Sequence, residues 1–226
     1  MSRILTILAL CVTSLPAAAA LIDRGSGLIY DTDLNLTWLA DANAAIGSAF
    51  DDGTNTTDGR MSWSSATAWA ADLAVGGATD WRLAATLDPD SSCTDDIAGS
   101  IPSIDPAGFN CSGSEMGHLF YVELGGTANS TIFGSGDPDL ALFSNLQGQY
   151  WSGTTDAAFP DFAWDFVFTS GAQSEAFKTT NFQHAWAVHG GDVAAVPLPA
   201  GGWLLGTGVI GALTWSRRGG RRNRGT

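Results

Sequence analysis

Histidines and carboxylates are the side chains of this 226-residue chain that could bind a metal or transfer protons. The three histidines, His118, His184 and His189, share no metal-ligand spacing. A zinc site needs at least three converging ligands, and a Ser–His–Asp triad lacks the Gly-x-Ser-x-Gly turn that would support it. With 23 carboxylates, pairs at the separation used for glycoside hydrolysis arise by chance. We therefore predict no catalytic residue and no metal ligand from these groups.

Calcium is the one cofactor that the residue types allow. The polar segment 41–58 is rich in Asp, Asn, Gly and Thr and is predicted to be a loop. Asp51, Asp52, Asn55 and Asp58 could offer oxygen ligands, although their spacing does not match a helix-loop-helix calcium site. The alternative is a solvated acidic loop without an ion.

The first 20 residues predict export. Arg3 precedes an apolar run, and the run ends in Pro16 and four alanines. This pattern is typical of a secretory signal peptide over residues 1–20, cut near Ala20. A single domain over residues 21–194 then remains before the tail.

The tail, residues 195–226, combines a short proline motif, an apolar run and an arginine cluster. The apolar stretch 196–215 has 20 residues, just enough to span a bilayer of about 30 Å. Arginines directly after it keep that end cytoplasmic. One interpretation is a permanent single-span anchor. The proline motif, which its two prolines keep extended and non-helical, consists of Val196, Pro197, Leu198, Pro199 and Ala200.

The order of these three features closely resembles the PEP-CTERM class of bacterial sorting signals, in its Val-Pro-Leu-Pro-Ala variant. The resemblance implies recognition by an exosortase, a membrane-embedded cysteine enzyme that cuts at the motif. The chain would be anchored transiently in the inner membrane and then displayed at the cell surface or released.

Cys93 and Cys111 are the cysteines of the exported part. Their even number, the export signal and the flanking loops predict a disulfide. It would close a loop of 18 residues and stabilise the fold by about 3 kcal/mol in the chain-entropy account.

The charge of the exported domain excludes some partners. Four cations, Arg24, Arg60, Arg82 and Lys178, stand against all 23 carboxylates between residues 21 and 194, a surplus of 19 negative charges. Such a surface repels nucleic acid and anionic lipid. It would attract divalent cations or basic partners, or serve only to keep an exported protein soluble.

Hydrophobic periodicity and turn residues predict a mixed α+β domain with long loops. A helix is expected from Ser62 or Ser64 to about Val75, closed by a left-handed cap at Gly76, and a second helix over residues 115–124. The predicted strands are residues 27–31, 34–39, 149–152, 164–168, 173–177 and 185–189.

One triplet between the first helix and the next strand is conspicuous. We expect Asp80 to accept backbone N–H groups at the turn and Trp81 to be buried. Arg82 is expected to make a bidentate pair with a carboxylate or with carbonyl oxygens. The alternative places Arg82 at the floor of a binding site.

The order of these motifs resembles the Lcl C-terminal domain family over about residues 28–192, most specifically in the core Gly76-Gly77-x-x-Asp80-Trp81-Arg82-Leu83. That family is similar in fold to C-type lectin-like and formylglycine-generating-enzyme-like domains. The resemblance implies paired N- and C-terminal strands, with residues 28–30 beside residues 185–189. This chain departs from the family at His189, where an arginine is common.

Together these features predict an exported, exosortase-sorted surface or extracellular-matrix protein with a non-enzymatic binding domain. Its ligand would be a glycan such as an extracellular polysaccharide, another polymer or a surface protein. The alternative is a formylglycine-generating-type oxidase, with Cys93 and Cys111 as a redox or copper pair, or a hydrolase.

Overall fold

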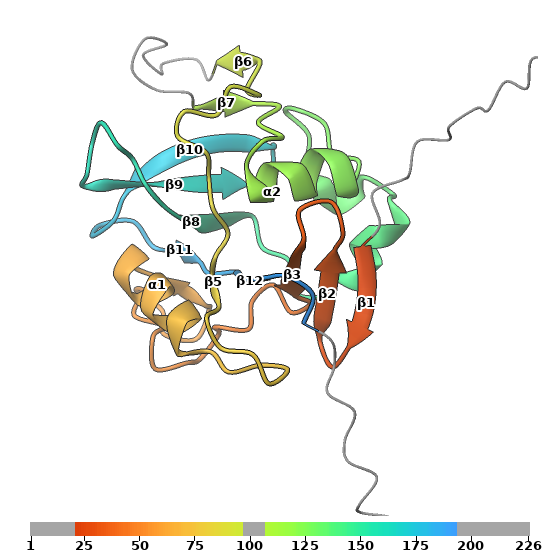
Figure 1. Ribbon diagram of the computed structural model, residues 1–226. Coiled ribbons are helices and arrows are strands. Elements are labelled where there is room, and N and C mark those ends of the chain that lie inside the picture. Colours follow the sequence, from red (N-terminus) through yellow and green to blue (C-terminus); the bar gives the residue numbers. More distant parts are fainter. Residues whose placement is uncertain (1–20, 97–106, 194–226) are drawn as a thin grey trace, which may run out of the picture. The chain divides into compact units, whose positions relative to one another are not determined.

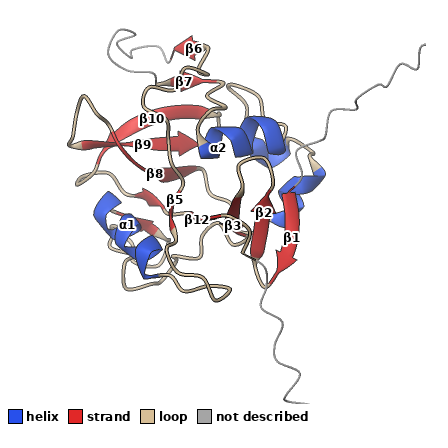
Figure 2. Cartoon of the chain, viewed as in Figure 1, coloured by secondary structure: helices blue, strands red, loops and turns tan. Residues whose placement is uncertain are grey.

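The computed structural model describes residues 21–96 and 107–193. The predicted signal peptide and the predicted sorting tail lie outside these residues. Within them the fold is α+β, as predicted: two α-helices and short, mainly antiparallel strands joined by long loops (Figures 1 and 2). No helix of the described part has the length and apolar character to span a membrane.

A five-stranded antiparallel sheet holds the first and last strands of the domain. Its strands follow the order β1-β2-β3-β12-β5. Their bounds are Leu21–Gly25 for β1, Leu28–Asp31 for β2, Leu36–Leu39 for β3, Arg82–Leu83 for β5 and Ala187–Gly190 for β12.

The predicted direct pairing of residues 28–30 with residues 185–189 is wrong. β12 pairs with β3, with Val188 opposite Trp38, and β3 separates it from β2. The prediction failed because β1, β2 and β3 pair consecutively, so that the free edge on which β12 pairs belongs to β3 and not to the first strand. The two ends of the domain still meet through an ion pair, because Arg24 Nε and Nη2 donate to the carboxylate of Asp192 at 2.9 and 2.5 Å.

A seven-stranded sheet forms the second part of the domain, in the order β4-β11-β8-β9-β10-β7-β6. Neighbouring strands are antiparallel except β11 and β8, which are parallel. The bounds are Arg60–Met61 for β4, Asp95–Asp96 for β6, Gly108–Phe109 for β7, Gln149–Thr155 for β8, Phe162–Val167 for β9, Ala172–Phe177 for β10 and Gln183–His184 for β11. Both faces of β9 are covered, since consecutive side chains along it are buried.

Helix α1, Trp63–Asp72, begins at Ser62, whose Oγ accepts the Ser65 N–H as an N-cap. The predicted left-handed cap at Gly76 is wrong. The helix ends at Asp72, before an extended Leu73, and Gly76 (φ +65°) lies in a turn in which Val75 and Ala78 exchange backbone hydrogen bonds. The glycine is needed for a reversal of the chain rather than for closing the helix.

The second predicted helix is present but changes its pitch. Glu115–His118 is α-helical (α2), and Leu119–Glu123 forms a π-helical turn (η1), with a hydrogen bond from Leu124 N to Leu119 O of 3.0 Å. Two 3₁₀ turns follow, η2 at Ile132–Gly134 and η3 at Pro138–Leu142.

Tryptophans fill the core between the two sheets. Trp186 Nε1 donates to Leu39 O at 2.7 Å and Trp151 Nε1 donates to Met61 O at 2.8 Å, whereas the indole nitrogens of Trp38 and Trp164 are buried without a partner among the described residues. The largest fully buried side chains are Trp38, Trp81, Trp151, Trp164, Trp186 and Tyr150. These bonds join Trp186 to β3 and Trp151 of β8 to β4 within the core.

Candidate functional site

The Asp80-Trp81-Arg82 triplet leads into β5. Trp81 is buried as predicted, at 2% exposure, and its Nε1 donates to Ala78 O at 3.2 Å. The prediction for Asp80 is wrong: the side chain is exposed, and among the described residues it accepts no hydrogen bond. Its backbone instead takes the left-handed conformation, φ +65°, which aspartate tolerates better than most residues.

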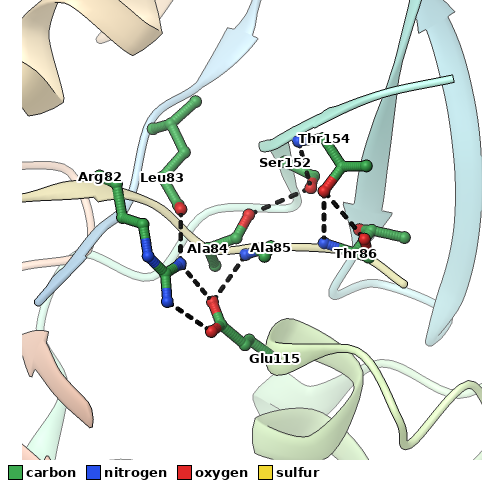
Figure 3. A network of polar contacts seen from close by, with 8 residues as sticks. All are labelled: Arg82, Leu83, Ala84, Ala85, Thr86, Glu115, Ser152 and Thr154. Carbon is green, nitrogen blue, oxygen red and sulfur yellow. Dashed lines mark hydrogen bonds and ion pairs between the residues drawn. The ribbon is translucent and has the colours of Figure 1, made fainter. Parts of the chain in front are cut away.

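Arg82 forms a bidentate ion pair with Glu115, the first residue of α2 (Figure 3). Nη1 and Nη2 donate to the two carboxylate oxygens at 2.7 and 2.6 Å, and Nη1 also donates to Leu83 O at 3.0 Å. Glu115 Oε2 accepts the Ala85 N–H at 2.6 Å as well. This pair therefore joins β5 to the start of α2.

The same segment is attached to β8 on its other side (Figure 3). Ser152 Oγ donates to Ala84 O at 3.1 Å, and Thr154 Oγ1 both donates to Thr86 O and accepts from Thr86 N. A cavity of about 220 Å³ adjoins Trp81 and Arg82. Because Glu115 and Leu83 already engage the guanidinium, the geometry favours the structural interpretation of Arg82 over a binding role.

The side chains of the four candidate calcium ligands accept hydrogen bonds from backbone N–H groups. Asp51 Oδ2 accepts the N–H groups of Gly47 and Gly59, and Asp52 accepts from Ser62 at the start of α1. Asp58 and Asn55 accept N–H groups two residues further along. Calcium binding here stays a prediction, since the aspartates of this loop belong to none of the converging ligand clusters in the described chain.

A polar cavity of about 350 Å³ opens beside this loop, and we call it the Arg60 cavity. Side-chain amides and hydroxyls dominate its lining, together with Arg60, Asp58 and Phe182. The amide and hydroxyl residues are Thr54, Asn55, Gln149, Thr180, Asn181 and Gln183. A second hollow of about 260 Å³ shares Arg60, Gln149 and Gln183 and extends to His184.

Arg60 enters this cavity from β4, where it pairs with His184 of β11. Its Nε donates to Phe182 O at 2.9 Å, and within residues 21–96 and 107–193 its two terminal nitrogens have no hydrogen-bond or ion-pair partner. Burial lowers the pKa of His184 below its ordinary value, and the charge of Arg60 acts in the same direction. The cavity therefore carries one available cation, together with the Asp58 carboxylate, and adjoins a partly buried histidine.

Asp165 accepts hydrogen bonds from two of the amides that line the cavity. Its Oδ2 accepts Gln149 Nε2 at 3.1 Å and Gln183 Nε2 at 2.7 Å, and its Oδ1 accepts Ser174 Oγ at 2.5 Å. Burial raises the pKa of Asp165, and these three hydrogen bonds oppose the rise. The amide of the half-buried Gln149 is therefore oriented with its oxygen left to accept from a ligand, whereas Gln183 Oε1 is buried without a partner.

The three histidines lie in three different parts of the fold. His184 Nδ1 is 3.2 Å from Gln149 O, and the His189 ring packs on Trp81 with centroids 5.5 Å apart. His118 Nε2 lies 3.2 Å from Glu123 Oε1. Asp31 completes that last group, for which the sequence gives no local signal because 87 residues separate Asp31 from His118.

Cys93 and Cys111 form a disulfide across 18 residues, in agreement with the prediction. It links the start of the segment 94–110 to its end and closes the outer edge of the seven-stranded sheet, where β6 pairs with β7. The pair offers no free thiol in this state.

The family assignment follows from one comparison with known proteins. The family model described as the Lcl C-terminal domain matches residues 27–189, most of the chain and nearly all of the described domain. Searches of curated proteins and of solved structures gave no match. The match confirms the family resemblance and indicates an extracellular or surface protein. The chain belongs to the Lcl C-terminal domain family.

Proposed function

We propose that the protein is an exported, surface-displayed binding protein whose domain holds a glycan ligand in the Arg60 cavity without chemical conversion. The observation that carries the proposal is the guanidinium of Arg60. In a domain with 23 carboxylates, its terminal nitrogens have no partner among the described residues, and they lie in a cavity lined by amides and hydroxyls.

The lining matches the chemistry of a polyhydroxylated ligand. Amide and hydroxyl groups donate to and accept from sugar hydroxyls, and a few fixed polar groups give orientation in a binding cavity. The planar guanidinium of Arg60 suits two adjacent oxygens, such as those of a uronic acid carboxylate. Asp165 supports Gln149 and Gln183, so these amides are oriented before the ligand arrives.

Retention on immobilised polysaccharides tests this proposal. The purified chain is passed over neutral and acidic polymers, with and without calcium. We expect retention on at least one polymer and release by the free polysaccharide. Failure to bind any polymer under either condition would contradict a glycan-binding function.

We further propose that an exosortase removes the tail at the motif Val196–Ala200. The support is the fixed order of an extended proline motif, a barely membrane-length apolar run and an arginine cluster. Intact-mass measurement of the native surface form should show a chain without residues 201–226. A mass that includes them would instead indicate a permanent anchor.

The enzymatic alternative makes a separate prediction about the cysteines. A formylglycine-generating-type oxidase needs a reactive thiol, so Cys93 and Cys111 would react with an alkylating reagent in the native exported protein. The disulfide between them supports the binding function. Labelling of both thiols without reductant would favour the enzyme.

A further inference from the structure

Three potential metal ligands converge far from the Arg60 cavity. Asp31 ends β2, His118 ends α2 and Glu123 ends η1. One ligand atom from each lies within 4.8 Å of the other two. In Figure 1 the turn after β2 lies directly beside the end of the α2–η1 helix.

The π-helical turn brings His118 and Glu123 onto one face. Residues five apart on a regular α-helix point in widely different directions, because each residue adds about 100° of rotation. The wider turn of η1, closed by the Leu124 N to Leu119 O bond, reduces this difference. As a result His118 Nε2 and Glu123 Oε1 lie 3.2 Å apart. Such single π turns occur frequently at functional sites.

Two carboxylate oxygens in this group are buried without a partner. Asp31 Oδ1 accepts the N–H groups of Asp33 and Leu34, but Oδ2 accepts none. Glu123 Oε1 faces His118, whereas Oε2 has no partner. Asp31 is 0% exposed and Glu123 is 4% exposed. A buried carboxylate oxygen is costly unless a donor or a metal satisfies it.

The surroundings concentrate negative charge on the group. Burial raises the pKa of Glu123 to about 7, and the charges of Asp31, Asp33, Asp139 and Asp137 add to the rise. No Lys or Arg of the described chain makes an ion pair with any of these carboxylates. The negative potential at the site therefore attracts a cation and disfavours the ionised form of Glu123 when no cation is bound.

We infer that Asp31, His118 and Glu123 bind one divalent transition-metal cation of the zinc class. An imidazole nitrogen with two carboxylate oxygens is a donor set for zinc rather than for calcium, which takes oxygen ligands only. The 3.2 Å between His118 Nε2 and Glu123 Oε1 is close to the edge of about 3.3 Å that zinc bonds of about 2.0 Å give in a tetrahedron. A water molecule would take the fourth position.

Such an ion would cross-link two parts of the fold. It would join the first hairpin, through Asp31, to the α2–η1 helix, and its charge would compensate the two buried carboxylates. This role is structural and independent of ligand binding in the Arg60 cavity, so the two proposals can fail separately.

Calorimetric titration of the tag-free, chelator-treated full-length chain with zinc chloride tests the inference. The titration is run at about pH 8, where the carboxylate ligands can ionise. We expect one zinc ion per chain and a rise in melting temperature that a chelator reverses. Absence of stoichiometric binding, or saturation by calcium in preference to zinc, would overturn the inference.

Variants assign the ligands. Asp31→Asn keeps an oxygen for the turn, and Glu123→Gln keeps the shape of the side chain; each should weaken zinc binding at least tenfold. The matched control is Asp33→Asn, because Asp33 is an exposed residue of the same turn. Removing its charge changes only the electrostatic potential at the site, so zinc binding should weaken less than about threefold. Equal binding by wild type and both ligand variants would contradict the assignment.

Cobalt keeps the test decisive if a ligand variant does not fold. Co²⁺ should replace zinc in the wild-type chain and give the strong visible absorption of a tetrahedral site with a nitrogen ligand. A weak spectrum, typical of six oxygen ligands, would exclude the proposed donor set.

Discussion

Arg82 and Arg60 each begin a short strand but differ in the partners of their guanidinium groups. Each begins a two-residue strand, β5 or β4, in a domain with a large surplus of carboxylates. Arg82 uses both terminal nitrogens on Glu115 and Leu83, whereas Arg60 uses only Nε, on a backbone carbonyl. The comparison teaches that the partners of an arginine, rather than the prominence of its motif, indicate whether its guanidinium is available to a ligand.

The largest expected effect concerns the surroundings of Arg82. Trp81→Ala should lower the free energy of unfolding by about 3–5 kcal/mol, because it empties the space of a fully buried aromatic side chain. Phe182→Ala at the half-buried rim of the Arg60 cavity should cost less than about 1.5 kcal/mol. Urea unfolding of both variants measures the difference. Similar losses would mean that the cavity wall is as structural as the Trp81 region.

Alanine variants of the two arginines should differ in their free energy of unfolding, by less than the effect of Trp81→Ala. Arg82→Ala removes a charge-assisted pair and leaves Glu115 uncompensated, but the Arg82 side chain is 46% exposed. We therefore expect a loss of about 1.5 kcal/mol, at the low end for such pairs. Arg60→Ala should change stability by less than about 0.5 kcal/mol. A larger loss for Arg60→Ala than for Arg82→Ala in chemical denaturation would reverse the comparison.

Much of the fold could be predicted from the sequence. Periodicity located α1, the helix that begins at Glu115 and most strands, because amphipathic patterns and turn residues are local signals. The strand neighbours could not be predicted in the same way. The pairing of β12 with β3 joins residues 150 or more positions apart, and the strand at Leu21–Gly25 carries no alternating pattern.

The candidate sites were harder to predict than the fold. The sequence identified Trp81 and Arg82 because a compact motif marks them, and it identified the cysteine pair from number and export. Arg60 lies between Gly59 and Met61 without any motif, and its role depends on β4 lying beside β11. The grouping of Asp31 with His118 and Glu123 depends on a π-helical turn, for which the sequence gives no recognisable signal.

The smallest effect concerns the support of the Arg60 cavity. Because the folded-state pKa of Asp165 is raised, its contribution to stability is present at low pH and is lost as pH rises through the folded-state value. Relative to Asp165→Asn, the wild type should therefore gain stability as the pH is lowered from neutral toward the ordinary aspartate value. Urea midpoints at several pH values measure this. A gain in the opposite direction would mean that hydrogen bonds, rather than burial, dominate at Asp165.

Binding by the two arginine variants tests the central claim most directly. The affinity of wild type, Arg60→Ala and Arg82→Ala is measured on the polysaccharide that retains the wild type, at a temperature where all three are folded. We expect Arg60→Ala to lose at least about tenfold in affinity, the cost of one charge-assisted contact, and Arg82→Ala to bind as the wild type does. Unchanged binding by Arg60→Ala, or a loss confined to Arg82→Ala, would contradict the assignment of the ligand to the Arg60 cavity.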